Sequence, residues 1–177
     1  MDDRRILADS LMSRAAGGDR DAFGRLAEIT GAAVYHFCLA HLPPRMRYSA
    51  ADVRQECFLR AWRDRKRFRT GGNAVAWLMG IALNVVREHR RKFRPALPLD
   101  NFDPSGKNRN EDERLEQLSA AVDALPARQR EAVICRFFGG MSVAETAAAM
   151  GCAEGTVKAA VFKAVENLQR IMNQQEP

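Results

Sequence analysis

The sequence predicts an all-α protein, and three observations support that fold class. Helix-forming Ala, Leu, Arg and Glu dominate, and the alternating β-branched pattern of strands is absent. Apolar residues instead recur at the spacing of a helix that buries one face. Pairs of glycines or prolines, such as Gly17-Gly18 and Pro43-Pro44, separate these stretches. We therefore expect two small helical domains joined by a flexible linker, with a helix-turn-helix in the C-terminal domain.

Two helices are expected before the proline pair. The first spans residues 4–16 and ends at Gly17-Gly18. The second begins within residues 19–21 and carries an apolar stripe from Phe23 to Cys38, at the spacing of a buried helix face. Pro43-Pro44 then interrupts the helical pattern.

A strongly amphipathic helix is expected next, with Ser49 or Asp52 as its N-terminal cap. Its polar face is either simply solvated or a surface on which a protein docks. The apolar side consists of Val53, Cys57, Phe58, Ala61 and Trp62.

A fourth helix begins at Ala74 after the turn Gly71-Gly72-Asn73, and we expect Gly80 to break it. Asn84 stands out in an otherwise apolar stretch, because its amide can either read a base edge or cap a helix. The basic run 87–94 follows, and its arginines are suited to binding phosphates. We expect Trp77 to belong to the core.

The C-terminal part begins after residues 95–110, which are rich in proline and turn residues and form the predicted linker. Helices are expected over residues 111–125 and 127–138. The stretch SVAETAAAMGCAEGTVKAAVFKA then has the pattern of a helix-turn-helix, whose second helix enters the DNA major groove. The markers of the helix-turn-helix are the capping-box pair Ser142 and Glu145, small Ala147, turn residue Gly151 and core residue Val157. An ordinary helical hairpin is the alternative.

The overall charge also favours a nucleic-acid partner. The 177 residues carry a formal net charge of +6, yet residues 45–94 alone hold 14 basic and 4 acidic residues, a net +10. This block lies far from the helix-turn-helix along the chain. Two separate contacts with nucleic acid are therefore expected.

The remaining composition excludes several classes of protein. The sequence has neither an 18-residue apolar run nor a signal-peptide core, so we expect a cytoplasmic protein without membrane insertion. It also lacks a glycine-rich phosphate loop, a nucleophile elbow and a metal-binding cluster, so no enzyme activity, cofactor or metal is expected. Reduced and mostly buried thiols are expected at Cys38, Cys57, Cys135 and Cys152.

Several motifs follow one another along the chain. They are D-V-x-Q-E-x-F-L-x-A-W, W-L-x-x-I-A-x-N, a linker, L-P-x-x-x-R-E, and a helix-turn-helix ending G-T-V-K. In this order they resemble a bacterial RNA polymerase sigma factor of the ECF (extracytoplasmic function) subfamily. The resemblance covers residues 19–168. It implies region 2-like residues 1–94, the linker 95–110 and region 4-like residues 111–177.

The resemblance also implies roles for individual residues. Contact with the β′ clamp helices of core polymerase is implied for Asp52, Gln55, Glu56, Leu59 and Arg60. In the family, a loop after W-L-x-x-I-A captures a flipped base of the −10 element. Base capture and adjacent backbone contacts are implied for Ile81, Ala82, Asn84, Arg87, Arg90, Arg91 and Lys92. Contact with the −35 element is implied for Gly155, Thr156, Lys158, Ala159, Phe162 and Lys163, with Arg128 and Arg130 on the flanking backbone.

The chain departs from the family where Ala159, Ala160 and Val161 follow G-T-V-K. Fewer base-edge hydrogen bonds are then available, so shape and phosphate contacts would matter more at −35. The resemblance further implies contact with the polymerase β subunit. It also implies an anti-sigma partner, which could hold the protein at the membrane. The alternatives are an autonomous dimeric repressor or activator, and a decoy that binds polymerase without opening promoters.

Overall fold

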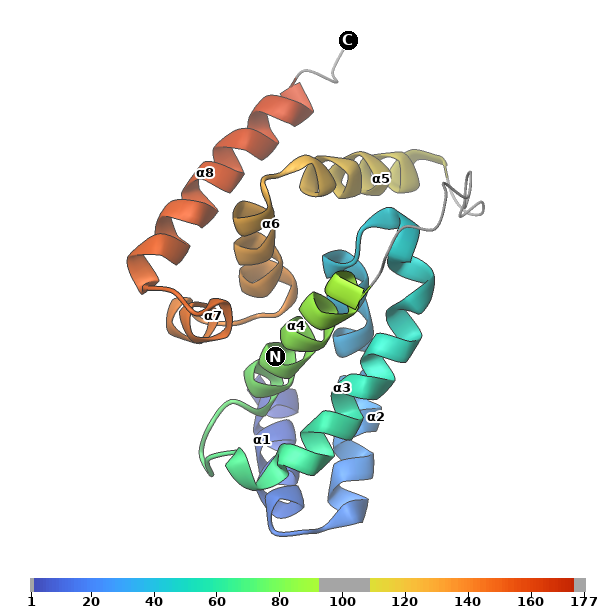
Figure 1. Ribbon diagram of the computed structural model, residues 1–177, viewed down its shortest axis with the longest axis vertical. Coiled ribbons are helices and arrows are strands. Elements are labelled where there is room, and N and C mark those ends of the chain that lie inside the picture. The colour runs from blue at the N-terminus through green and yellow to red at the C-terminus, as the bar shows by residue number, and fades with distance from the viewer. Residues whose placement is uncertain (1, 93–108, 174–177) are drawn as a thin grey trace.

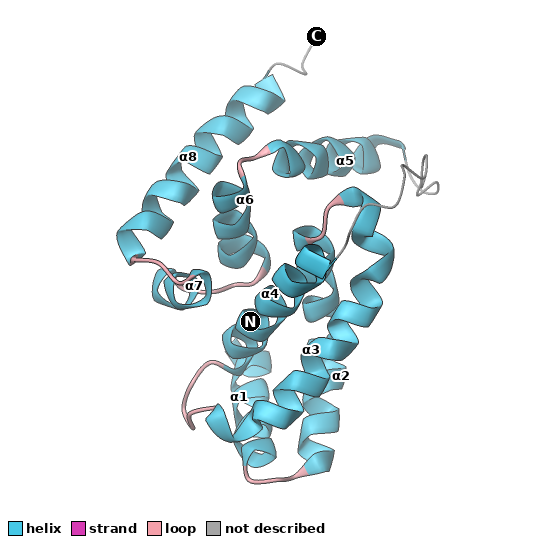
Figure 2. Cartoon of the chain, in the orientation of Figure 1, coloured by secondary structure: helices cyan, strands magenta, loops and turns pink. Residues whose placement is uncertain are grey.

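The computed structural model describes residues 2–92 and 109–173, and the regular structure in those ranges is entirely helical (Figures 1 and 2). The all-α prediction is confirmed, while the predicted linker lies almost wholly outside the described residues. The helices in chain order are α1 (Asp2–Ala16), α2 (Arg20–His41), η1 (Pro44–Ser49), α3 (Ala50–Asp64), η2 (Arg65–Arg67), α4 (Ala74–Lys92), α5 (Arg109–Ala124), α6 (Ala127–Val133), η3 (Ile134–Phe138), α7 (Val143–Met150) and α8 (Glu154–Asn173).

Helix α4 occupies the centre of the arrangement. It packs on α1, α2 and α3, and it also contacts α7 (Figure 1). In this view α5, α6 and α8 lie in the upper part, α1 lies in the lower part, and α7 lies at the left at about the height of α4. No helix in the described part of the chain combines the length and the apolarity that a membrane crossing requires.

Two residues at helix N-termini in the first half of the chain, Asp19 and Ser49, differ in whether their side chains cap the helix. Helix α2 begins where expected, and Asp19 caps it, because its Oδ1 accepts a hydrogen bond from the Ala22 N–H at 2.9 Å. Ser49 occupies the N-cap position of α3, yet its hydroxyl donates backwards to the Met46 carbonyl at 2.7 Å. The expected side-chain cap at Ser49 is therefore wrong. The 3₁₀ turn η1 begins at the second proline of the pair and was not revealed by the sequence pattern. Its Met46 carbonyl accepts the hydrogen bond of that hydroxyl.

The predicted break at Gly80 is also wrong, because α4 is continuous through it. A glycine inside a helix costs about 1 kcal/mol relative to alanine. Burial of Leu78, Met79 and Leu83 on the core face offsets that cost. The helix starts as expected after the glycine pair, where the Asn73 side chain accepts a hydrogen bond from the Ala76 N–H.

The C-terminal helix-turn-helix confirms its sequence markers. Ser142 and Glu145 form the reciprocal capping box of α7. Gly151 ends α7 with φ at +64°, the left-handed conformation that glycine adopts without strain. Val157 is fully buried and anchors α8. The preceding helix differs from expectation, because its last five residues widen into the π-helical turn η3.

One apolar core runs through both halves of the described chain. Phe37 of α2 is completely buried, and η3 and its following turn pack against α2. A Cβ placed on Gly139 would lie only 2.9 Å from Cε2 of Phe37, so a glycine permits this close approach. Cys38, Cys57 and Cys135 are buried free thiols, while Cys152 is only half-buried. The boundaries of the two domains stay a prediction.

Candidate polymerase and nucleic-acid interfaces

The outer face of α3 combines polar and apolar groups. Asp52, Gln55 and Leu59 lie at helical spacing and all are exposed, Leu59 by 59%. A groove of about 690 Å³ between α2 and α3 adjoins them. Phe23 lies in this groove with its ring centroid 5.2 Å from that of Trp62. Aromatic rings beside exposed polar groups are typical of a surface that binds another protein.

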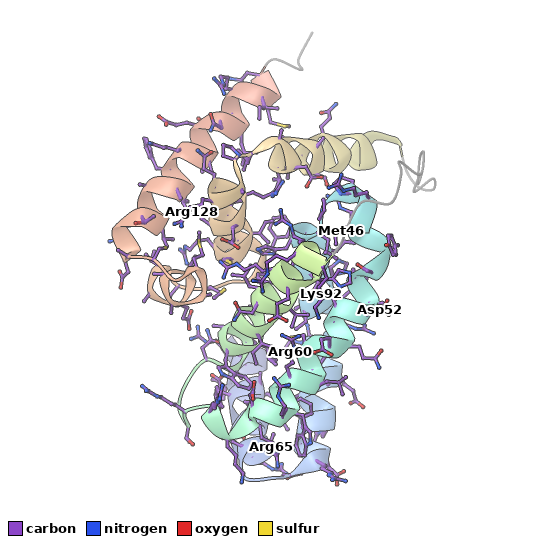
Figure 3. All side chains as sticks on the ribbon, in the orientation of Figure 1. Met46, Asp52, Arg60, Arg65, Lys92 and Arg128 are labelled. Carbon is purple, nitrogen blue, oxygen red and sulfur yellow. The ribbon has the colours of Figure 1, made fainter. Side chains whose placement is uncertain are left out.

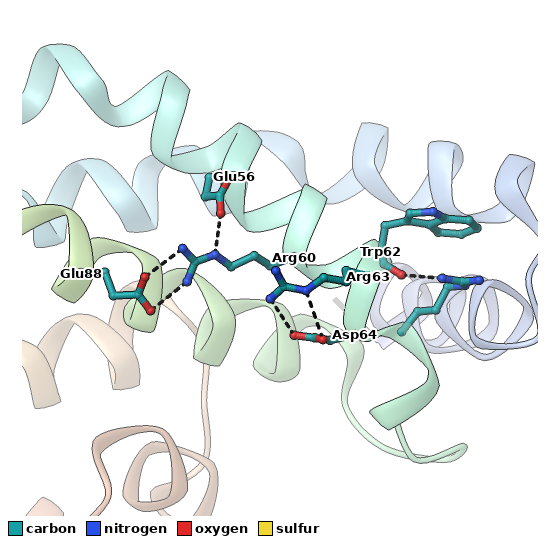
Figure 4. Close-up of polar contacts among 7 residues, drawn as sticks. Glu56, Arg60, Trp62, Arg63, Asp64 and Glu88 are labelled. Carbon is teal, nitrogen blue, oxygen red and sulfur yellow. Dashed lines mark hydrogen bonds and ion pairs between the residues drawn. The ribbon is translucent and has the colours of Figure 1, made fainter.

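Arg60 is committed to contacts within the protein. Its guanidinium bonds both carboxylate oxygens of Glu88 on α4, at 2.8 and 2.9 Å, and Oε1 of Glu56 at 2.6 Å (Figure 4). These hydrogen bonds raise the pKa of Arg60 above its ordinary value and lower the pKa of Glu88. Arg60 therefore joins α3 to α4, and sequence reasoning did not identify Glu88 as its partner.

Replacing Arg60 by alanine is expected to lower the free energy of unfolding by about 1 kcal/mol. The bidentate geometry is favourable, but Glu88 is one-third exposed, so solvent screens the pair. Arg63→Ala is the matched control, since Arg63 is 70% exposed and only approaches Asp64 at 3.5 Å. Urea unfolding of both variants measures the difference. Equal midpoints for the two would contradict a bridging role for Arg60.

One face of α4 borders a cleft lined mainly by arginines. Asn84, Arg87 and Arg91 lie three and four residues apart on this face, so their side chains point the same way. The cleft encloses about 850 Å³. Arginines in this number attract phosphate groups. Its arginines come from three parts of the chain and are Arg45, Arg60, Arg63, Arg87, Arg90 and Arg91.

The residues implied for −10 capture are not equally placed. Asn84 is exposed and Ile81 is half-buried at the cleft wall, whereas Ala82 is completely buried in the core. All three belong to α4 and not to a loop, so the implied loop is wrong for this chain. Ala82 presents no surface to a ligand. Arg90, Arg91 and Lys92 are exposed at the helix end, where Figure 3 labels Lys92.

Arg87 makes contacts that no sequence pattern indicated. Its Nε donates to Glu131 of α6 at 2.8 Å, and its Nη1 donates to the Ala149 carbonyl of α7 at 3.2 Å. Both partners belong to the C-terminal half. Arg87 therefore connects the arginine-lined cleft to the helices around the helix-turn-helix.

The first turns of α8 present the groups expected of a DNA-reading helix. Gly155, Thr156, Lys158, Ala159 and Lys163 are exposed, and Phe162 is 65% exposed. The opposite face carries the buried residues Val157 and Ala164. The free N–H groups at the start of a helix favour a phosphate, and the exposed phenyl ring suits contact with a thymine methyl.

The two arginines implied for the flanking DNA backbone differ in how exposed their side chains are. Arg128 is exposed on α6 (Figure 3). Arg130 is half-buried, and its Nη1 donates to the Asp123 carbonyl at 2.9 Å. Arg128 is therefore the better placed of the two to meet DNA.

Two family models match the chain. Sigma-70 region 2 matches residues 26–94, and Sigma-70, region 4 matches residues 115–168. The ECF RNA polymerase sigma factor BldN of Streptomyces coelicolor is 38% identical over 186 residues, covering 96% of this chain and 70% of that protein. This chain belongs to the ECF sigma factors. The resemblance inferred from the motifs is thus confirmed.

Solved structures resemble this ECF sigma factor over most of its length. CnrH in complex with the cytosolic domain of CnrY has a TM-score of 0.74 at 24% identity, covering 96% of this chain and 99% of that one, and shows the shared fold. The sigma factor RpoE in complex with the anti-sigma factor NepR, from Bartonella quintana, has a TM-score of 0.69 at 25% identity. That match covers 87% of this chain and 98% of the RpoE chain.

Proposed function

We propose that this ECF sigma factor directs core RNA polymerase to promoters and helps to open them, contributing binding contacts and no catalysis. One observation carries the proposal. The arginine-lined cleft with Asn84 at its wall lies on α4, and the helix-turn-helix lies on α7 and α8. A protein with two such surfaces can hold duplex DNA at one and a melted strand at the other.

The docking surface on core polymerase would be the outer face of α3 with its aromatic groove. Asp52, Gln55 and Leu59 supply exposed contacts to the β′ clamp helices, and Glu56 lies at their edge. Arg60 would stabilise the position of this surface, because its hydrogen bonds to Glu88 hold α3 on α4. The C-terminal helices would meet the β subunit.

The −10 element would bind at α4 as a single strand. Asn84 can donate and accept hydrogen bonds at the edge of an extruded base, with Ile81 beside it. Arg90, Arg91 and Lys92 would hold the adjacent phosphates. Ala82 contributes only by packing.

The −35 element would bind at the start of α8, with Gly155 and Thr156 on phosphate and with Lys158, Ala159, Phe162 and Lys163 on the face that meets the groove, where the Lys158 ammonium group would also contact a phosphate. Because alanines follow Lys158, we expect sequence preference here to come partly from DNA shape.

Lys158→Ala is expected to weaken binding to duplex −35 DNA and to reduce the slope of log K against log salt by about one. Loss of one phosphate contact releases one fewer counterion, which explains the change in slope. Fluorescence anisotropy at several salt concentrations measures it. Arg170→Ala is the control, because Arg170 is exposed near the far end of the same helix. An unchanged slope would exclude a phosphate contact at Lys158.

The decisive experiment adds the purified chain to core RNA polymerase on genomic DNA and sequences the transcript starts. A shared upstream motif at new start sites is the expected result. An autonomous repressor would instead bind duplex DNA without the core enzyme, and a decoy would bind polymerase without new starts. Failure to bind core enzyme and to yield new starts would refute the proposal.

We also propose that the protein acts in the cytoplasm and that an anti-sigma factor controls it. RpoE of Bartonella quintana, which this chain resembles in structure, is seen with such a partner. An anti-sigma partner anchored in the membrane would hold this sigma factor there. Copurification of the tagged chain from its native cells, with and without detergent, tests both points.

A further inference from the structure

The arginine-lined cleft has two walls, and the proposed −10 contacts account for one of them. Helix α4 forms the first wall, with Asn84, Arg90 and Arg91. The second wall comes from α3 and from the turn η1, and it includes Arg63 and Arg45. Six arginines and two carboxylates line the cleft as a whole, so its charge is positive. A strand lying along α4 would therefore meet positive charge on both sides.

The six arginines differ in how far other protein groups already occupy them. Arg60 and Arg87 each form ion pairs of 2.8 Å or shorter. Arg63 lies 3.5 Å from the carboxylate of Asp64. The exposed arginines that form no ion pair within the described ranges are Arg45, Arg90 and Arg91. An arginine without an internal partner keeps its donors for a phosphate, and of these three Arg45 lies on the second wall.

The backbone that carries Arg45 is held on both sides. Pro43 and Pro44 precede it, and the proline ring restricts φ, which is −62° at Pro43. Met46 follows it, is buried in the core, and donates its N–H to the Pro43 carbonyl at 2.8 Å (Figure 3 labels Met46). The Met46 carbonyl accepts from the Ser49 hydroxyl at 2.7 Å. Because the turn is already ordered, a contact made by the Arg45 side chain would cost little backbone entropy.

We propose that η1 belongs to the promoter-binding surface, and that Arg45 contacts a phosphate of the melted −10 strand across the cleft from Arg90 and Arg91. This inference rests on the proposed function of α4. The backbone of a strand whose base is held at Asn84 would run between the two walls, and Arg45 would neutralise a phosphate on the side away from α4. Phosphate contacts position a strand and carry no sequence information themselves, so Arg45 would strengthen the binding of any sequence.

Arg45→Ala tests the contact. Arg25→Ala is the matched control, because Arg25 is exposed on α2 and does not line the cleft. Fluorescence anisotropy of the full chain with a fluorescein-labelled, random-sequence 20-nucleotide single strand measures the affinity at several salt concentrations. Loss of one phosphate contact should reduce the slope of log K against log salt by about 0.7 and weaken binding about fivefold at about 0.1 M salt. Arg45→Lys keeps the charge and should retain most of the slope.

Further measurements separate this contact from the others in the cleft and from effects on the fold. Arg90→Ala removes a phosphate contact proposed for the first wall and should change the slope by a similar amount. Arg45→Ala combined with Arg90→Ala should reduce the slope by about 1.4, because contacts with different phosphates add. The urea midpoint of Arg45→Ala should equal that of the unmodified chain, since the Arg45 side chain is exposed. Its binding to core enzyme in gel filtration should also be unchanged.

The outcomes decide the inference separately from the proposed function. Equal slopes for Arg45→Ala and Arg25→Ala would overturn it, and so would a double variant whose slope equals that of Arg90→Ala alone. Loss of core binding by Arg45→Ala would also overturn it, because η1 would then contact polymerase and not the strand. If the slopes change as expected but the chain and core enzyme yield no new transcript starts, the proposed function fails while the phosphate contact stands.

Discussion

Asn84→Ala is expected to reduce promoter opening ten- to hundredfold while binding to core RNA polymerase stays unchanged. Among the polar residues that line the cleft, Asn84 is uncharged and all the others are charged. The Asn84 amide is therefore the group suited to read a base edge. Loss of a paired base contact costs about 1–3 kcal/mol, which corresponds to this range. The docking face on α3 does not include Asn84, so core binding has no reason to change.

Permanganate reactivity of thymines in the melted region measures opening, and gel filtration with core enzyme measures docking. Asn173→Ala serves as the control, because Asn173 is an exposed asparagine at the far end of α8. If core binding and opening fell by the same factor, the residue would act through the fold or through docking. The role in base capture would then be withdrawn.

The second large effect is a loss of stability in mild acid that depends on His41. This histidine is buried on α2, its Nδ1 donates to the Phe37 carbonyl at 3.0 Å, and its Nε2 finds no hydrogen-bond partner among the described residues. Burial lowers the pKa of His41 from 6.5 to about 4. The neighbouring charges partly offset one another, since Glu131 raises the pKa while Arg87 and Arg130 lower it.

The direction of the pH effect follows from proton binding. Between pH 6.5 and 4 the unfolded chain binds a proton at His41 that the folded chain does not bind, so acid favours unfolding. The contribution of His41 is complete above pH 6.5 and is lost as the pH falls to about 4. With 1.36 kcal/mol for each pH unit, the loss is roughly 3 kcal/mol.

Urea unfolding at several pH values checks this expectation. His41→Asn retains a donor near the Phe37 carbonyl but cannot take up a proton, so its stability should fall less over the same pH range. Carboxylates such as Glu145, whose pKa is lowered by hydrogen bonds, contribute equally in both proteins and cancel in the comparison. His36→Asn is the control, because His36 is exposed. Parallel curves for His41→Asn and the unmodified chain would refute the assignment.

Short-range signals in the sequence predicted the C-terminal helices well. The Ser142–Glu145 box and the left-handed Gly151 each act over four residues or fewer, so the residues themselves determine the local conformation. Gly80 shows the limit of such signals. Its local preference is to break a helix, yet buried neighbours on both sides keep α4 continuous.

The partners of the site residues could not be predicted in the same way. Arg60 meets Glu88 across 28 residues, and Arg87 meets Glu131 across 44. A charged residue on a polar helix face looks the same in the sequence whether it faces solvent, DNA or another helix. Packing of α3 and α7 on α4, and the contact of Arg87 with Glu131 of α6, select among those possibilities.

Helical fold class, motif order and the ECF sigma family could therefore be inferred from residues alone, because period, caps and motif spacing are local properties. The packing of distant helices added the burial of Ala82, the internal pairing of Arg60 and the contacts of Arg87 with α6 and α7. Those features depend on which side chains meet across the fold, and the free energy of such contacts is set by burial and geometry that no single stretch of sequence contains.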